Sequence, residues 1–126
     1  MKGRRTMAEM NKVEPIIITD NETGETYTLE FDRDTVRKAE DNGFSLADVQ
    51  KYPTKAYDLW NYAFYMHHNR EFITRKLTKK KTDELLDAIG GALNAPDGLW
   101  GRLGDLYVQA YTTIGDGKNG RVTVTF

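Results

Sequence analysis

No cysteine occurs among the 126 residues of this chain, which excludes a disulfide scaffold, a cysteine nucleophile and a thiolate metal site. Only two histidines are present, so a histidine-rich metal site is not expected either. No apolar run approaches the roughly 20 residues that a membrane span requires, and the basic first residues lack the apolar core of a secretory signal. We therefore expect a protein of a reducing cytosol that holds no metal and no cofactor.

An excess of charge of one sign is also missing. The 18 basic and 19 acidic side chains leave a net charge of −1, so the chain as a whole has no attraction for nucleic acid or acidic membranes. Residues 1–13 lack a hydrophobic period and predict a disordered N-terminal arm, whose basic side chains leave contact with nucleic acid as an alternative to a solvated tail. Residues 14–114 are expected to form a single α+β domain, and residues 115–126 a C-terminal tail or edge strand.

Residues 15–31 predict a β-hairpin. A β-branched run, PIIITD, precedes the turn sequence NETGE, in which Asn21 tolerates and Gly24 freely adopts a left-handed backbone. The next residues, TYTLEF, alternate and place three apolar side chains on one face: Tyr27, Leu29 and Phe31. Because an isolated hairpin is marginal in water, this one is expected to pack on helices or to pair with another strand.

Two helices are predicted directly after the hairpin. The first spans about residues 32–42, with Asp34 as its N-cap and Gly43 ending it, and Phe44 is expected to fold back onto it. Ser45 is the predicted cap of a second, short helix, LADVQKY.

The stretch Thr54–His68 predicts a central helix, which Pro53 can start because proline lacks the N–H that would be unpaired there. One face of this helix is apolar at helical spacing and consists of Ala56, Leu59, Trp60, Ala63, Phe64 and His67. His67 is therefore expected to be a partly buried histidine and not a metal ligand. Tyrosines on the other faces indicate that the helix either lies centrally or meets a partner.

Two further helices are predicted. Thr78 is the expected cap of one, which Gly90-Gly91 ends before a turn-rich break, NAPDG. The last spans about residues 97–113, and Gly101 and Gly104 either admit a close neighbouring helix or let its start unwind.

The final residues, RVTVTF, alternate, so they either form a third strand, with the hairpin or with another copy, or remain loose. The whole pattern predicts an α+β fold: an N-terminal β-hairpin, a mainly helical domain of about five helices and a possible short C-terminal strand.

No catalytic pattern is found in this sequence, and we expect no enzyme. His67 and His68 are consecutive, so they point about 100° apart on a helix and cannot grip one metal ion together. Ser45 is the only serine and is expected to act as a cap. Carboxylates such as Glu40 and Asp41 lie on predicted exposed helix faces, where they are solvated.

Aromatic residues are abundant instead. Seven tyrosines and two tryptophans occur, mostly on the two long predicted helices, and such side chains dominate binding hot spots because they bury large areas with few rotatable bonds. Trp60 and Phe64 are expected to fill the core. The candidates for contact with a protein partner are Tyr57, Tyr62, Tyr65, Trp100, Tyr107 and Tyr111.

The order of these segments resembles the tail assembly chaperones of long-tailed phages and prophages of Gram-positive bacteria. The resemblance covers roughly residues 14–114 and rests on two sets of spaced residues. They are the run Glu40, Gly43, Ser45 and Asp48, and the segment from Ile73 to Ile89 with Leu85, Leu86 and Asp87.

The resemblance implies a small, mainly helical α+β protein of the host cell cytoplasm, encoded between the major tail protein and the tape measure protein, often with a longer frameshifted form. Such chaperones bind the hydrophobic, helical tape measure protein, recruit tail tube subunits, often self-associate and are absent from the finished virion. The family has no sharp functional motif, so the resemblance assigns no binding residues.

Two alternatives remain open. Another phage morphogenesis component, such as a head–tail connector or tail terminator, would form a closed ring. A small nucleic-acid-binding regulator would use the basic arm and the cluster Lys79–Lys81, and its binding would weaken steeply with salt.

Overall fold

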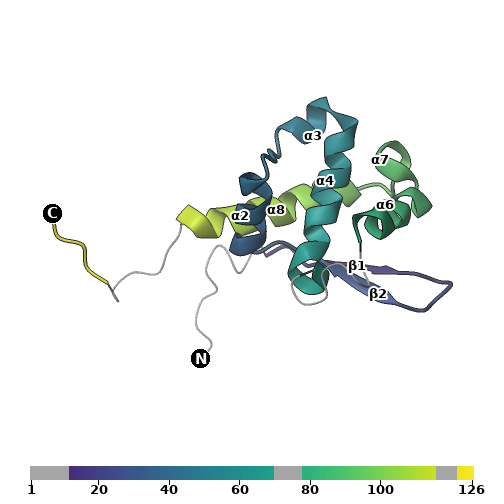
Figure 1. Ribbon diagram of the computed structural model, residues 1–126, viewed down its shortest axis with the longest axis horizontal. Helices are drawn as coiled ribbons and strands as arrows, with labels where there is room; N and C mark the ends of the chain where they lie inside the picture. Colours follow the sequence, from purple (N-terminus) through teal and green to yellow (C-terminus); the bar gives the residue numbers. More distant parts are fainter. Residues whose placement is uncertain (1–11, 70–77, 116–121) are drawn as a thin grey trace.

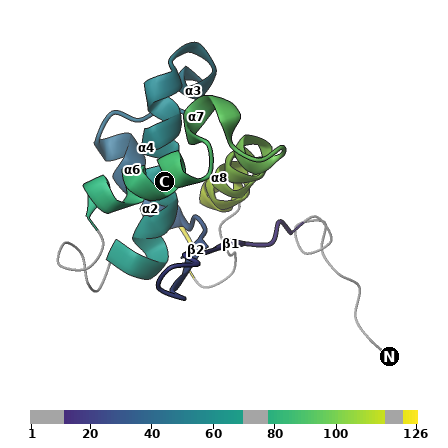
Figure 2. The ribbon, with the colours of Figure 1, turned by 90° about the vertical axis from the view of Figure 1, so that its right-hand side faces the viewer.

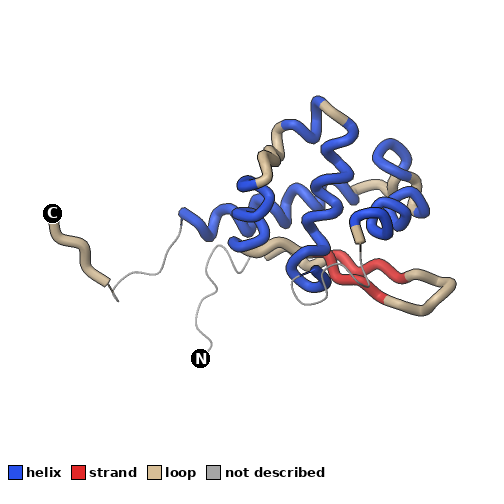
Figure 3. Tube along the Cα trace, viewed as in Figure 1, coloured by secondary structure: helices blue, strands red, loops and turns tan. Residues whose placement is uncertain are grey.

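The computed structural model describes residues 12–69, 78–115 and 122–126, in which a β-hairpin precedes a group of packed helices (Figure 1). The predicted α+β fold is confirmed. The elements are β1 (Ile16–Thr19), β2 (Thr26–Leu29), α2 (Arg33–Asp41), α3 (Asp48–Lys51), α4 (Pro53–Phe64), the π-helical turn η1 (Tyr65–Asn69), α6 (Lys79–Ala88), α7 (Gly91–Asn94) and α8 (Leu99–Gly115). In the part of the chain that the structure describes, helices account for most of the fold and strands occur only in the hairpin (Figure 3).

The hairpin packs against one end of the helical layer, as two perpendicular views show (Figures 1 and 2). Its antiparallel register places Ile16 opposite Leu29. The three alternating apolar side chains predicted from the sequence are buried: Tyr27, Leu29 and Phe31. The hairpin therefore contributes one wall of the core, and its face would be exposed to water without the helices.

Helix α2 lies in the predicted range, but its N-cap is not the predicted residue. Its N-cap is Asp32 rather than Asp34, since the Asp32 carboxylate accepts hydrogen bonds from the Thr35 N–H and the Thr35 hydroxyl, both at 2.7 Å. Thr35 is itself fully buried. Asp32 is therefore a more stabilising N-cap than Asp34, because its carboxylate satisfies two donors of Thr35 in the first turn at once.

The end of α2 follows the prediction closely. The Gly43 N–H donates to the Glu40 carbonyl at 2.9 Å, and the Phe44 N–H donates to the Ala39 carbonyl at 3.0 Å. These two bonds form a Schellman motif, which requires a left-handed residue, and Gly43 has φ +84°. Phe44 folds back into the core, as expected.

The prediction that Ser45 caps the next helix is wrong. Helix α3 is a single turn whose N-cap position is Ala47, and no side chain caps it. Ser45 lies two residues before that position, too far back for its hydroxyl to reach the first helical amides. Its carbonyl accepts the Asp48 N–H instead, at 3.1 Å.

Helix α4 is the centre of the core. Pro53 occupies its first turn, as predicted, and its buried residues are Ala56, Leu59, Trp60, Ala63 and Phe64. The Trp60 indole N–H donates to the Thr82 carbonyl of α6 at 2.7 Å. The buried apolar face of α4 therefore also holds α6 in place through one hydrogen bond.

Helix α6 starts at the predicted cap, where the Thr78 hydroxyl accepts the Lys81 N–H at 3.1 Å, and it ends before Gly90, which has φ +119°. The chain then forms the short helix α7, which the sequence did not predict. The Trp100 indole N–H reaches the Ala92 carbonyl of α7 at 3.0 Å, so a contact with α8 holds this turn in place.

Helix α8 buries three residues of one face, Leu103, Leu106 and Ala110. Val13, predicted to belong to the disordered arm, is tied to this helix, since its N–H donates to the Gln109 side-chain oxygen at 2.5 Å. Residues 1–11 of that arm, and Ile73, lie outside the described residues. The described residues 122–126 form no strand and run apart from the folded body (Figure 3).

Candidate functional site

The aromatic residues predicted to contact a partner occupy three places in the fold. Tyr57 and Trp100 adjoin α7, Tyr62 and Tyr65 share a hollow beside α6, and Tyr107 and Tyr111 share another beside the end of α2. Their exposure differs widely, from 4% for Tyr107 to 49% for Tyr111. The three places therefore have to be judged separately.

The pair beside α7 makes hydrogen bonds within the chain. The Tyr57 hydroxyl donates to the Asp87 carboxylate of α6 at 2.7 Å, and this carboxylate raises the pKa of Tyr57 above its ordinary value. Trp100 donates to the Ala92 carbonyl. Both side chains are partly buried against the core, and both stabilise the junction of α6, α7 and α8.

Tyr62 and Tyr65 border a shallow hollow of about 190 Å³ between α4 and the start of α6. The other lining residues are mostly polar and include Asn61, Lys79 and Thr82. Tyr62 also contacts Phe44, with ring centroids 5.8 Å apart. This hollow offers half-buried aromatic rings but little continuous apolar surface.

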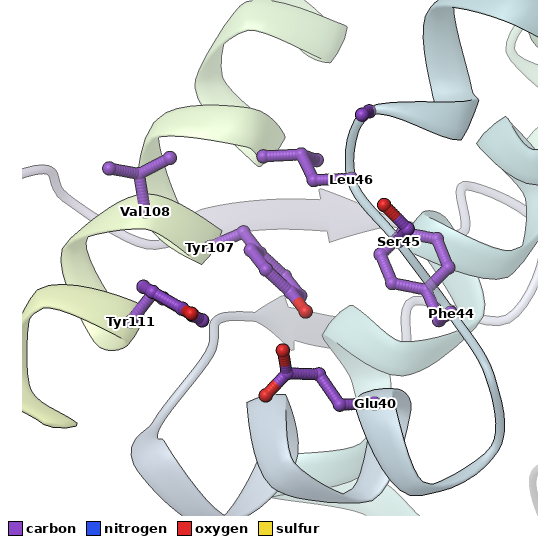
Figure 4. A pocket seen from close by; sticks show the side chains of 8 residues that line it. Glu40, Phe44, Ser45, Leu46, Tyr107, Val108 and Tyr111 are labelled. Atoms are coloured by element: carbon purple, nitrogen blue, oxygen red, sulfur yellow. The ribbon is translucent and has the colours of Figure 1, made fainter.

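The third place is a larger hollow of about 300 Å³ between α8, the end of α2 and the loop that follows it (Figure 4). We call it the α2–α8 hollow. Its lining residues are Glu40, Phe44, Ser45, Leu46, Ala47, Tyr107, Val108 and Tyr111.

The Schellman motif at Gly43 builds one wall of the α2–α8 hollow. It reverses the chain so that Phe44 packs on Tyr107, with ring centroids 5.6 Å apart. Tyr107 also contacts Phe31 of the hairpin side, at 5.1 Å. Tyr107 is thus a core residue that forms the floor of the hollow, and its exposed area is too small for it to be a main contact by itself.

The rim of the hollow is exposed and apolar. Tyr111 is 49% and Val108 is 48% exposed, and both project from α8, while Leu46 faces them from the loop (Figure 4). Val108 was not among the residues predicted from the sequence. Its spacing of three from Tyr111, just off the buried face of α8, is the signal that identifies it.

A single carboxylate lies at the edge of the hollow. Glu40 projects from α2 toward the two tyrosines (Figure 4). Burial and, after it, the charge of Glu40 raise the pKa of Tyr107 to about 12, so its hydroxyl stays protonated at neutral pH. The hollow can therefore accept apolar side chains and carries one negative charge at its edge.

His68, not His67, is the half-buried histidine, so the prediction that His67 is partly buried is wrong. His67 is exposed and lies 2.8 Å from the Glu30 carboxylate, whereas the His68 ring packs on Phe64 and accepts the Thr28 N–H at its Nε2 atom. The π-helical turn causes this difference, because its extra residue rotates the following side chains by about 100° relative to an α-helix.

Among the described residues, no group of three or more histidine, cysteine, aspartate or glutamate side chains is placed to hold a metal ion. Within the same residues, no helix is both long enough and apolar enough to cross a membrane.

Fold and hollow together define a small helical α+β domain with a hollow whose rim exposes Tyr111 and Val108. Residues 7–126 match the family described as "Domain of unknown function (DUF5055)", and the chain belongs to that family. No curated protein and no solved structure matches the chain.

Proposed function

We propose that this protein is a non-catalytic phage tail assembly chaperone that binds the tape measure protein in the host cytoplasm and helps tail tube assembly. The proposal rests on the resemblance of residues 14–114 to such chaperones and on the α2–α8 hollow. It extends beyond the family match, which assigns no function.

One observation supports the proposal most strongly. Three of the residues that support the resemblance, Glu40, Gly43 and Ser45, also shape the α2–α8 hollow. Gly43 reverses the chain at the end of α2, and Glu40 and Ser45 line the hollow. The rim that they face exposes Tyr111 and Val108.

The size and chemistry of the hollow suit an apolar side chain of a partner helix. An apolar cavity of about 150 Å³ holds a benzene ring, and the α2–α8 hollow measures about 300 Å³. An amphipathic helix inserts apolar anchors into such hollows at helical spacing. A long, helical, hydrophobic tape measure protein would supply many of these anchors, and covering them would keep it soluble.

The experiment is co-expression of the full chain with an affinity-tagged tape measure segment. The soluble fraction of the segment is measured first, and affinity capture of the complex then gives Kd. We expect Tyr111→Ala to weaken the complex by about 30-fold, because removing a hot-spot tyrosine costs about 2 kcal/mol. Leu93→Ala is the matched control, since Leu93 is 82% exposed on α7, away from the hollow. It should leave Kd unchanged.

Three results would contradict the proposal. The tape measure segment would remain equally insoluble with and without the protein, or Tyr111→Ala and Leu93→Ala would have equal effects. A closed ring of fixed stoichiometry that ignores the tape measure would instead indicate a connector or terminator.

A further inference from the structure

The two outer edges of the hairpin are covered differently. On the edge of β2, the Thr28 N–H donates to His68 Nε2 at 2.9 Å, and just beyond the strand the Glu30 N–H donates to the Ala63 carbonyl at 3.0 Å. Both acceptors belong to α4 and η1. This edge is therefore occupied by the chain itself.

β1 forms the other edge, and no strand pairs with it there in the described part of the chain. Ile17 lies opposite Thr28 and Thr19 lies opposite Thr26. Because the Thr28 N–H points away from β1, Ile17 and Thr28 form a pair without mutual hydrogen bonds, and the same holds two residues further for Thr19. The backbone groups of Ile17 and Thr19 consequently point outward, ready to bind another strand.

A hollow of about 350 Å³ lies beside the last two residues of β1, Ile18 and Thr19, and is bordered by the following turn and by α6. No β2 residue lines it, so its hairpin wall consists of β1 and the turn alone. Its apolar part consists of Ile18, Leu85, Ala88 and Ile89. A strand added to β1 would place every second side chain over this hollow.

Residues 122–126 have the properties of such a strand. Val122, Val124 and Phe126 alternate with threonines, and they are 78%, 71% and 113% exposed. β-branched and aromatic residues favour strands, and large apolar side chains left in water favour association. We propose that residues 122–126 of a second copy of this chain add to the edge of β1 as a third strand and place Val122 and Val124 in the hollow beside α6.

Residues 122–126 of a second copy can reach the edge of β1 more easily than those of the same chain. Val13 lies beside Gln109 of α8, and from this contact the hairpin and the end of α8 extend in opposite directions (Figure 1). The six residues from Gln109 to Gly115 add about 9 Å, and the six from Val13 to Thr19 add up to about 20 Å. The seven steps from Gly115 to Val122 span at most roughly 24 Å. Pairing within one chain would require nearly full extension of that connection, whereas pairing between copies requires none.

Cysteine cross-linking tests this proposal well because the chain has no cysteine of its own. Ile17 is 60% exposed on the outer face of β1, and the threonines of an added strand would lie on the same face. One full-length copy carries Ile17→Cys, and the other carries Thr123→Cys or, separately, Thr125→Cys. After mixing and mild oxidation, we expect a disulfide-linked dimer with at least one of the two threonine positions.

Two controls make the result specific. Thr112→Cys on the exposed face of α8 replaces the threonine variants and should give only background cross-linking. Val124→Pro, added to the Thr123→Cys and Thr125→Cys copies, should abolish the dimer, because proline has no N–H to donate and disrupts an added strand. Val124 is exposed, so this change should leave the melting temperature unaltered.

Background-level cross-linking at both threonine positions would overturn the proposal. So would a disulfide that forms only inside one chain carrying both cysteines, which would show that the strand returns to its own hairpin. The experiment contains no tape measure protein, so its outcome is independent of the proposed function.

Discussion

His68 joins the hairpin to the helices through one nitrogen atom. Its Nε2 accepts the Thr28 N–H at 2.9 Å, and its ring packs against Tyr27 and Phe64 with centroid distances of 5.5 and 5.9 Å. An accepting Nε2 belongs to the neutral ring. Burial, the largest cause, and the adjacent His67 both lower the pKa of His68 below its ordinary value.

The stability of the protein should therefore fall in mild acid. The unfolded chain binds a proton at His68 near pH 6.5, whereas the folded chain binds it only at lower pH. Between these two pKa values the unfolded state holds more protons, so the free energy of unfolding decreases as the pH falls, and it levels off below the folded pKa. Urea titrations from about pH 7.5 to about pH 5 measure this step.

The variant His68→Phe identifies the source of the step. It keeps an aromatic ring beside Phe64 but leaves the Thr28 N–H without its acceptor, at a cost of about 1 kcal/mol near neutral pH. In this variant the step below pH 6.5 should shrink, while it should persist in His67→Gln. An equal step in wild type and His68→Phe would assign the acid sensitivity to other groups.

Glycine is favourable at the end of a helix, where the backbone is left-handed, and unfavourable in the interior of a helix. Gly43 completes the end of α2 with φ +84°, whereas Gly101 lies inside α8. A Cβ atom added at either position would meet nothing within 4 Å. Close approach of another helix was one of two alternatives predicted for Gly101 and Gly104, and within the described residues it is not found, since open space surrounds both.

The pair Gly43→Ala and Gly101→Ala separates backbone conformation from packing. Gly43→Ala should destabilise the protein by about 1–2 kcal/mol, because a left-handed conformation is unfavourable for alanine. Gly101→Ala should stabilise it by about 0.5–1 kcal/mol, because alanine loses less backbone freedom in a helix. Chemical denaturation of both variants at one pH gives the two values. Two changes of the same sign would show that a contact, not the backbone, decides one of them.

At the scale of the whole molecule, the sequence predicts what depends on short-range periodicity. The alternation around Leu29 and the helical spacing around Trp60 identified the core faces of the hairpin and of α4, since each needs only its own pattern. The burial of His68 rather than His67 was not predictable, because a π-helical turn has no reliable signature in one sequence.

Features that depend on distant residues were missed for a related reason. Helix α7 is a single turn held by the Trp100 contact from α8, and short helices have little stability of their own. The α2–α8 hollow requires the end of α2 and the side of α8 to meet. Tyr111 was identified as a candidate by its residue type, but only the assembled fold separates it from the buried Tyr107.

The hairpin and the helices should unfold as one unit, because neither completes a core alone. Leu29 is fully buried between β2 and the helical layer, so Leu29→Ala should cost about 2–5 kcal/mol through lost burial and the cavity left behind. Thr19→Ala on the exposed side of β1 is the control and should change stability by at most about 0.5 kcal/mol. Far-UV circular dichroism reports the helices, and tryptophan fluorescence reports the surroundings of Trp60 in the core and of the partly buried Trp100. In Leu29→Ala both transitions should shift to the same lower denaturant concentration. In a molecule that unfolds as one unit, a substitution in β2 also lowers the stability of the helices. A helical transition that stays at its wild-type midpoint would show that the helices fold without the hairpin.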